Sequence, residues 1–146
     1  PAGPGEFSLV LAWSVFTHVN QEQAEFYLRE AARVLRPDGV LLATFFLFDK
    51  GEFPMMQSFQ NALFINETDP SNAVIFDRAW LPAAAAATGL TLTAARPPRI
   101  RGYQWLLQLR PARAGLEAVA LPADQPPPGS LPPPLMPADA ERLGRE

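Results

Sequence analysis

The most apolar stretch of the chain is residues 40–48, in which only Thr44 carries a polar group. Turn-forming residues flank it, with Pro37, Asp38 and Gly39 before it and an Asp-Lys-Gly sequence after it. The run is too short to cross a membrane, and its β-branched and aromatic residues favour a strand over a helix. A continuous apolar run of this length predicts a strand buried on both faces, in the middle of a parallel sheet.

A second apolar run, residues 7–13, predicts another buried parallel strand. A helix is expected over residues 21–35, because Asn20 and Gln23 form a capping box and apolar residues then recur every three or four positions. Pro37 ends this helix, and the turn over residues 36–39 leads into the central strand. Strand, helix and strand at this spacing form a βαβ unit with parallel strands.

The residues after the central strand are harder to assign. Residues 49–76 are the least regular, although five side chains fit one face of a short helix, either as core packing or as a pocket lid: Met55, Met56, Phe59, Leu63 and Phe64. Asp77 is expected to cap a helix over residues 78–88, which Gly89 ends. Residues 90–95 and 103–109 alternate as two strands do.

Proline divides the chain into two parts. Nine of the 17 prolines lie in residues 111–146, which predicts an extended or disordered tail behind a folded domain of residues 1–110. The chain has no cysteine, which excludes disulfides and thiolate metal sites and permits a cytoplasmic location. A net charge of −3 gives no sign of a nucleic-acid binder, and no signal peptide or membrane-length segment is seen.

Several segments together resemble the second half of a class I S-adenosylmethionine-dependent methyltransferase. The resemblance is continuous in order over the first part of the chain, from Phe7-Ser8-Leu9-Val10 through Ser14-Val15-Phe16-Thr17-His18 and Tyr27-Leu28-Arg29-Glu30 to Arg33-Val34-Leu35-Arg36-Pro37-Asp38-Gly39. It continues weakly at residues 69–73, 77–81 and 88–90. It implies a partial Rossmann-like α/β sheet, parallel except for one antiparallel strand at residues 103–109.

The sequence departs from this family in three ways. Ser8 stands where relatives usually carry Asp, and Asp38 stands where they carry the first of two glycines. More importantly, the Gly-rich turn and the acidic residue by which the family holds its cofactor are absent. In the family's strand order the far side of strand 7–13 pairs with the missing half, so we expect this edge to be covered by that half or by a second subunit.

The resemblance also implies a site and a cofactor. Ligands of open α/β sheets bind beyond the carboxyl ends of the strands. We therefore expect the cofactor, S-adenosylmethionine, to be bound by Trp13, Ser14, Val15 and Phe16. His18, the only histidine, becomes the candidate general base, and the substrate pocket is assigned to Phe48, Asp49, Met55, Met56 and Phe59. Each has a structural alternative: His18 can be a helix-entry hydrogen-bonding residue, and Trp13 can pack in the core. No metal site is expected.

Three functional hypotheses follow. The first is methyl transfer to a small-molecule or glycan-like acceptor, because residues 12–15 lack the Asn/Asp-Pro-Pro-aromatic run of enzymes that methylate planar nitrogens. In this first hypothesis the chain supplies the substrate-side half of a methyltransferase. It does so in the cytoplasm, either as part of a homo-oligomer or together with the missing amino-terminal half. The second is a catalytically silent, methyltransferase-like subunit that pairs through its open edge. The third is an unrelated α/β domain that shares only a βαβ unit.

Overall fold

The computed structural model describes residues 2–52, 60–64, 73–99 and 103–122. Two helices and six strands form in these residues, together with a short 3-10 turn. In chain order they are β1 (Phe7–Ala12), α1 (Gln21–Val34), β2 (Leu35–Phe48), η1 (Lys50–Glu52), β3 (Ala62–Phe64), β4 (Val74–Asp77), α2 (Trp80–Ala87), β5 (Leu90–Arg96) and β6 (Trp105–Pro111).

β2 is the central strand of a mixed sheet. It pairs in parallel with β1 through residues 40–43 and in antiparallel fashion with β6 through residues 41–45. Farther along, it pairs in parallel with β4, and β3 and β5 are added antiparallel to β4 and β6. The predicted fold class, a parallel α/β sheet with one antiparallel strand near its end, is confirmed for β1, β2 and β6.

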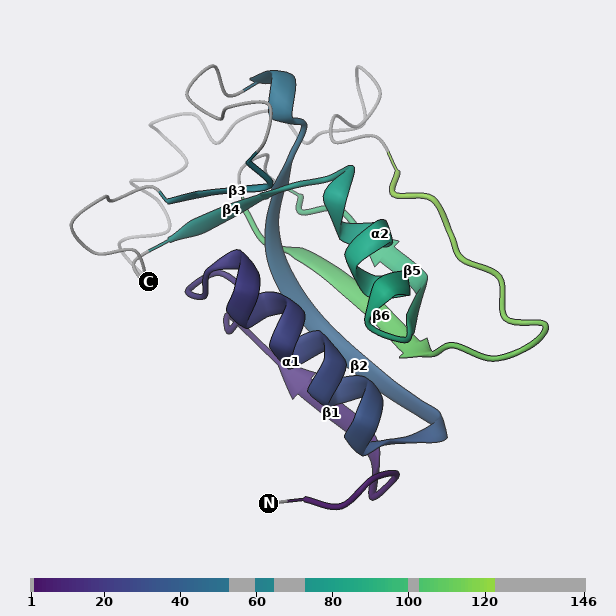
Figure 1. Ribbon diagram of the computed structural model, residues 1–146. Helices are drawn as coiled ribbons and strands as arrows, with labels where there is room; N and C mark the ends of the chain where they lie inside the picture. The colour runs from purple at the N-terminus through teal and green to yellow at the C-terminus, as the bar shows by residue number, and fades with distance from the viewer. Residues whose placement is uncertain (1, 53–59, 65–72, 100–102, 123–146) are drawn as a thin grey trace, which may run out of the picture.

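Both helices lie on the same face of the sheet, with α1 over β1 and β2 (Figure 1). Beneath them, the odd-numbered side chains of β2 form the core, with at most 1% of the surface of Leu41, Ala43, Phe45 and Leu47 exposed. Phe45 stacks on Phe16 with ring centroids 4.4 Å apart. The opposite face carries no helix among the described residues, and there Leu42 and Phe46 are only half-buried. The prediction that β2 is buried on both faces therefore holds fully only for the face that the helices cover.

The capping box of α1 forms as expected. The side chain of Asn20 accepts a hydrogen bond from the Gln23 N–H at 2.8 Å, and the Gln23 side chain accepts one from the Asn20 N–H at 2.9 Å. The helix then runs from Gln21 to Val34 with Ala24, Leu28 and Ala31 buried, close to the predicted range. This cap fixes where the chain leaves the loop that follows β1.

The predicted turn at residues 36–39 lies inside β2. Phe7 pairs with Leu35 and Leu9 with Val40, so the intervening residues of β2 bulge out of the ladder, and the ribbon bends sharply there (Figure 1). Gly39 is required at this bulge, since a Cβ atom on it would lie 3.0 Å from the backbone oxygens of Arg36 and Phe7. The bulge also explains why β2 begins earlier than its apolar run.

Two other predictions were wrong in detail. Asp77 ends β4 instead of capping α2, whose N-cap is Ala79 without a side-chain hydrogen bond. Leu63 and Phe64 belong to β3 and not to a short helix, while Met55, Met56 and Phe59 lie outside the described residues. Gly89, with φ +86°, ends α2 as predicted, and β5 and β6 match the two predicted strands.

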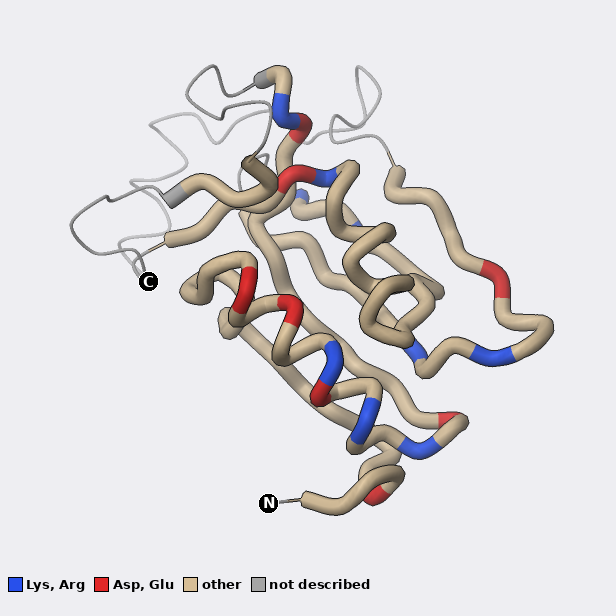
Figure 2. Tube along the Cα trace, in the orientation of Figure 1, with Lys and Arg blue, Asp and Glu red and all other residues tan. Residues whose placement is uncertain are grey.

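The edge of β1 that faces away from β2 has no partner strand among the described residues. Four side chains beside it are at least 44% exposed, namely Phe7, Leu9, Leu11 and Trp13. Charged residues gather along α1 and where β2 and β4 end, but none lies on β1 (Figure 2). An uncharged, apolar edge of this kind calls for a covering segment.

Neighbouring phenylalanines on β2 test which face forms the core. Phe45→Ala should lower the free energy of unfolding by about 3–5 kcal/mol, because it leaves a cavity between Phe16 and Phe76. Phe46→Ala, on the half-buried face, should lower the free energy of unfolding clearly less. Both losses are measured by urea titration. Equal losses from the two substitutions would contradict the assignment of the core to the helix-covered face.

Candidate functional site

The loop that follows β1 is held in an uncommon backbone conformation. Ser14 has φ +56°, a left-handed value that residues other than glycine seldom adopt. Three hydrogen bonds hold it there. Its N–H donates to Thr44 Oγ1 at 2.8 Å, its carbonyl accepts from Thr17 Oγ1 at 3.0 Å, and its hydroxyl accepts from Gln104 Nε2 at 2.6 Å. The loop is thereby fixed to β2 and to the start of β6.

The amide of Gln104 is only partly satisfied. Its nitrogen reaches Ser14, but its oxygen is buried and has no hydrogen-bond partner in the described part of the chain. An unpaired buried acceptor of this kind is costly, because the desolvation of the oxygen is not repaid. The Gln104 side chain therefore has one buried polar atom that the described residues leave unpaired.

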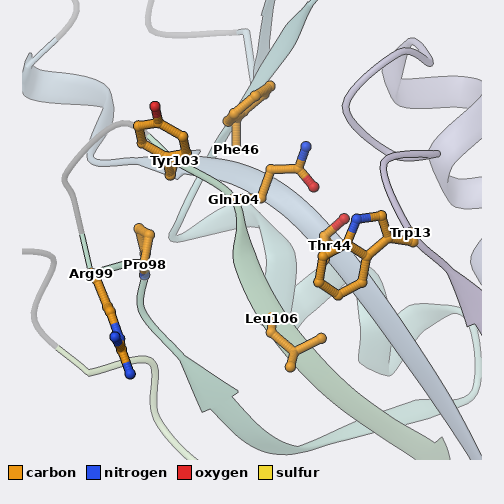
Figure 3. Close-up of a pocket in the computed structure, with 8 residues that line it drawn as sticks. All are labelled: Trp13, Thr44, Phe46, Pro98, Arg99, Tyr103, Gln104 and Leu106. Carbon is orange, nitrogen blue, oxygen red and sulfur yellow. The ribbon is translucent and has the colours of Figure 1, made fainter. Parts of the chain in front are cut away.

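Ser14, Thr17, Thr44 and Gln104 form a hydrogen-bonded polar cluster. A cavity of about 650 Å³ adjoins it. It lies on the sheet face that α1 and α2 do not cover, with Trp13 and Thr44 on one side and Pro98, Arg99 and Tyr103 on the other (Figure 3). Its lining combines aromatic and apolar side chains with two polar groups from the cluster: Trp13, Thr44, Phe46, Pro98, Arg99, Tyr103, Gln104 and Leu106. Such a volume and lining are typical of small-molecule sites.

A second set of charged groups lies where β2 and β4 end. Arg78 binds Asp49 at 2.9 Å, donates to the Pro122 carbonyl, and lies over the Trp105 ring at 5.1 Å. Lys50 Nζ lies 3.7 Å from Asp77. The hydrogen bond from Arg78 to Pro122 ties residues 112–122 to the sheet, and the Val119 N–H also donates to the Leu92 carbonyl. None of these charged groups lines the cavity.

The four residues predicted to contact a cofactor have different surroundings. Trp13 is 64% exposed and lines the cavity, and Ser14 holds the loop. Val15 is 40% exposed and lies on a separate groove between β1 and α1, whereas Phe16 is 1% exposed and lies in the core. The predicted cofactor contact of these four residues stays a prediction.

The other predicted site residues that the structure describes, His18, Phe48 and Asp49, do not line the cavity. His18 is exposed, its N–H donates to the Val15 carbonyl at 3.1 Å, and it does not line the cavity. Phe48 is half-buried, and Asp49 is the ion-pair partner of Arg78. Their predicted roles as general base and substrate contacts stay predictions.

Sequence reasoning missed most of the cavity lining. Thr44 was visible as the one polar residue of the central run, and Gln104 as a polar residue just before β6. Nothing in the sequence indicates that these two residues and Ser14 meet, since they come from three separate segments. Among the described residues, no group of three or more His, Cys, Asp and Glu side chains could hold a metal ion.

Comparison with known proteins identifies the fold. The family model described as "Methyltransferase domain" matches residues 1–43. The 1,6-didemethyltoxoflavin-N1-methyltransferase of Burkholderia thailandensis, crystallised with 1,6-didemethyltoxoflavin and S-adenosylhomocysteine, superposes with a TM-score of 0.58 at 18% identity, over 77% of this chain and 47% of that one. The chain has the methyltransferase fold. The resemblance predicted from the sequence is confirmed.

Two further solved structures share this methyltransferase fold. An S-adenosylmethionine-dependent methyltransferase from Methanosarcina mazei has a TM-score of 0.55 at 14% identity, over 75% of this chain and 61% of that one. An O-methyltransferase from neocarzinostatin biosynthesis was crystallised with S-adenosylmethionine and 2-hydroxy-5-methyl naphthoic acid. It superposes with a TM-score of 0.54 at 18% identity, over 77% of this chain and 31% of that one. This chain spans less than two thirds of the length of each of these structures.

The hydrogen bond between Thr44 and Ser14 can be tested by substitution. Thr44→Val should lower the free energy of unfolding by about 1–3 kcal/mol, because the Ser14 N–H loses its acceptor. The control is Thr91→Val on β5, half-buried, whose hydroxyl makes no hydrogen bond within the described residues; it should change stability by less than about 0.5 kcal/mol. Comparable losses in thermal unfolding would show that Thr44 does not hold the loop.

Proposed function

We propose that this chain is the substrate-side half of an S-adenosylmethionine-dependent methyltransferase acting on a small-molecule acceptor. The strand arrangement carries this proposal: the parallel strands β1 and β2 are joined by α1, and the antiparallel β6 is inserted between β2 and β5. The match of residues 1–43 to a methyltransferase domain and the solved methyltransferases of the same fold support it.

The cavity supports an acceptor of small-molecule size. It opens beside the loop after β1, at the end of the sheet where ligands of open α/β folds bind. Its aromatic lining suits a flat ring better than a glycan, whose hydroxyl groups would need more polar partners than Thr44 and Gln104 provide. Two of the similar solved proteins hold ring compounds, which agrees with this choice.

The reaction sets what the residues must do. A sulfonium methyl group is transferred by in-line displacement, so the acceptor atom must be held in line with the methyl group and, where it is protonated, must lose its proton. In our proposal the aromatic side chains of the cavity, Trp13 among them, orient the acceptor. His18, which lies outside the cavity, takes the proton from an acceptor that extends toward the loop after β1. Trp13, Ser14 and Val15 face the cofactor, since Phe16 lies in the core.

The cofactor is held mainly by protein that lies against β1. The sequence has no Gly-rich turn after a strand, so the binding surface for S-adenosylmethionine is incomplete in these residues. The open edge of β1 and its exposed side chains are where the missing half, or a second copy of the chain, would pair. We place this assembly in the cytoplasm, in keeping with the absence of cysteine. No helix in the described residues is long and apolar enough to span a membrane.

A catalytically silent subunit remains the second candidate. The exposed apolar edge of β1 favours it, because such an edge is suited to pairing with another chain whether or not methyl transfer occurs. The two candidates differ in one respect that can be measured, since a silent subunit transfers no methyl group.

Transfer of tritium from [methyl-³H]S-adenosylmethionine to aromatic alcohols and amines tests the proposal on the native polypeptide that contains these residues. Trp13→Ala should raise the KM for the acceptor and also weaken binding of the cofactor, because in this proposal the indole lines the cavity and faces the cofactor. Phe26→Ala, which removes an exposed aromatic side chain of α1 outside the cavity, is the matched control. Absence of transfer to any acceptor would favour the silent subunit.

The role of His18 is tested by substitution. If His18 is the base, His18→Gln should lower kcat by about 100-fold or more and leave the KM for the acceptor nearly unchanged, because glutamine is polar but cannot take the proton. A histidine that only stabilises the helix entry would leave kcat nearly unchanged. An unaltered kcat in the variant would therefore exclude the base.

A further inference from the structure

Arg99 is the one charged residue among the described residues that line the cavity. It follows Pro98, shortly after the end of β5, and lies across the cavity from Trp13 (Figure 3). Its guanidinium group has no ion-pair partner in the described part of the chain, and no acidic side chain lines the cavity there. The cavity therefore has a positive charge on its wall that no carboxylate of these residues neutralises.

A second arginine strengthens this positive field. Arg96 on β5 pairs opposite Leu106 on β6, so the two side chains project from the same face of the sheet, and Leu106 lines the cavity. Arg96 is exposed and does not itself line the cavity. Its charge acts at longer range and attracts anions toward this face.

The exposure of Arg99 decides how strongly an anion would bind. Because the side chain is exposed, an anion can reach the guanidinium group while both charges keep part of their water. The desolvation penalty is then small, but the gain from an exposed ion pair is also small and is screened by salt. Arg99 would therefore add selectivity to binding for which the rest of the cavity supplies most of the free energy.

The rest of the lining suits a flat ring. Trp13, Phe46 and Tyr103 provide aromatic faces and edges, and Leu106 adds aliphatic surface (Figure 3). A ring compound without charge would use this surface and leave Arg99 unpaired. A ring that carries an anionic group would use both parts of the cavity.

A carboxylate matches this charge better than a phosphate does. A carboxylate carries one negative charge, which a single guanidinium group balances and can bind through two parallel hydrogen bonds. A phosphate monoester carries nearly two negative charges at neutral pH, and within the described residues no second Lys or Arg lines the cavity. Charge complementarity therefore favours an aromatic acid.

We propose that the cavity binds a flat aromatic acid, with its ring against the aromatic side chains and its carboxylate at Arg99. Arg99 is then a specificity residue that separates aromatic acids from neutral ring compounds. As a methyl acceptor, such an acid also carries a hydroxyl or amino group, and this role rests on the function proposed above. Binding of the acid to the cavity needs neither the cofactor nor methyl transfer.

Indole-3-acetate and indole-3-acetamide form a matched pair of probes, because they have nearly the same shape and only the acetate is charged at neutral pH. Their dissociation constants are measured by ligand-observed NMR on the native polypeptide that contains these residues, without S-adenosylmethionine. At an ionic strength of about 20 mM the acetate should bind about fivefold more tightly than the amide, and this ratio should fall toward one at about 300 mM.

Three variants make the result specific. Arg99→Gln should reduce the ratio to about one by weakening only the acetate. Arg29→Gln makes the same change of charge at an exposed position of α1, outside the cavity and on the helix-covered face, so the ratio should remain. Leu106→Trp takes up space in the cavity and leaves Arg99 in place, so it should weaken both probes by about tenfold or more.

The proposal is overturned by equal binding of the two probes to the unaltered protein at low ionic strength, or by no binding of either probe at millimolar concentration. It is also overturned by a ratio that survives Arg99→Gln or that Arg29→Gln removes as fully, since the net charge and not Arg99 would then select the acid. Each of these outcomes is independent of methyl transfer, so a protein that transfers methyl groups but fails here loses only this inference. Selective binding of the acetate by a protein without transferase activity would keep it.

Discussion

The backbone pairing of β2 is the interaction on which the rest of the structure depends. β1 and β6 pair with it along residues 40–45, and β4 pairs with it farther on. Its odd-numbered side chains form the core under the helices, while Thr44 and Phe46 on its other face line the cavity. A change in the register of β2 by one residue would exchange these two faces, so the core and the candidate site are fixed by the same pairing.

Among the described residues, the sheet that β2 organises is uncovered in two places. β1 has no partner on its outer edge, and the face that holds the cavity carries no helix within the described residues. Both places are apolar, and both adjoin the loop of Ser14. One covering segment on that side would therefore bury the exposed edge, close the cavity from solvent and bring the cofactor near the acceptor. This common location is why we connect the uncovered parts of the sheet with the cofactor site that we propose.

Sequence patterns were sufficient for the elements whose signals are local. The capping box and the three- and four-residue spacing predicted α1, and continuous or alternating apolar runs predicted β1, β2, β5 and β6. β4 was missed because a four-residue apolar run has no periodicity that separates a strand from other buried segments. For the same reason Leu63 and Phe64 were assigned to a helix.

The cavity depended on information that no local pattern contains. Gln104 reaches Ser14 across 90 positions of the chain, because Leu106 on β6 pairs opposite Thr44 on β2. The sequence indicated the carboxyl end of β1, since parallel strands of α/β folds place their ligands there. It did not indicate which side chains of the antiparallel strand meet that end.

Calorimetric titration of S-adenosylmethionine into the native polypeptide that contains these residues tests the central claim most directly, namely that this sheet is half of a cofactor-binding methyltransferase. The account predicts one binding site with micromolar affinity, a free energy of about −8 kcal/mol. Absence of binding at millimolar cofactor would contradict it. The methyltransferase fold would then serve pairing through β1 and not catalysis.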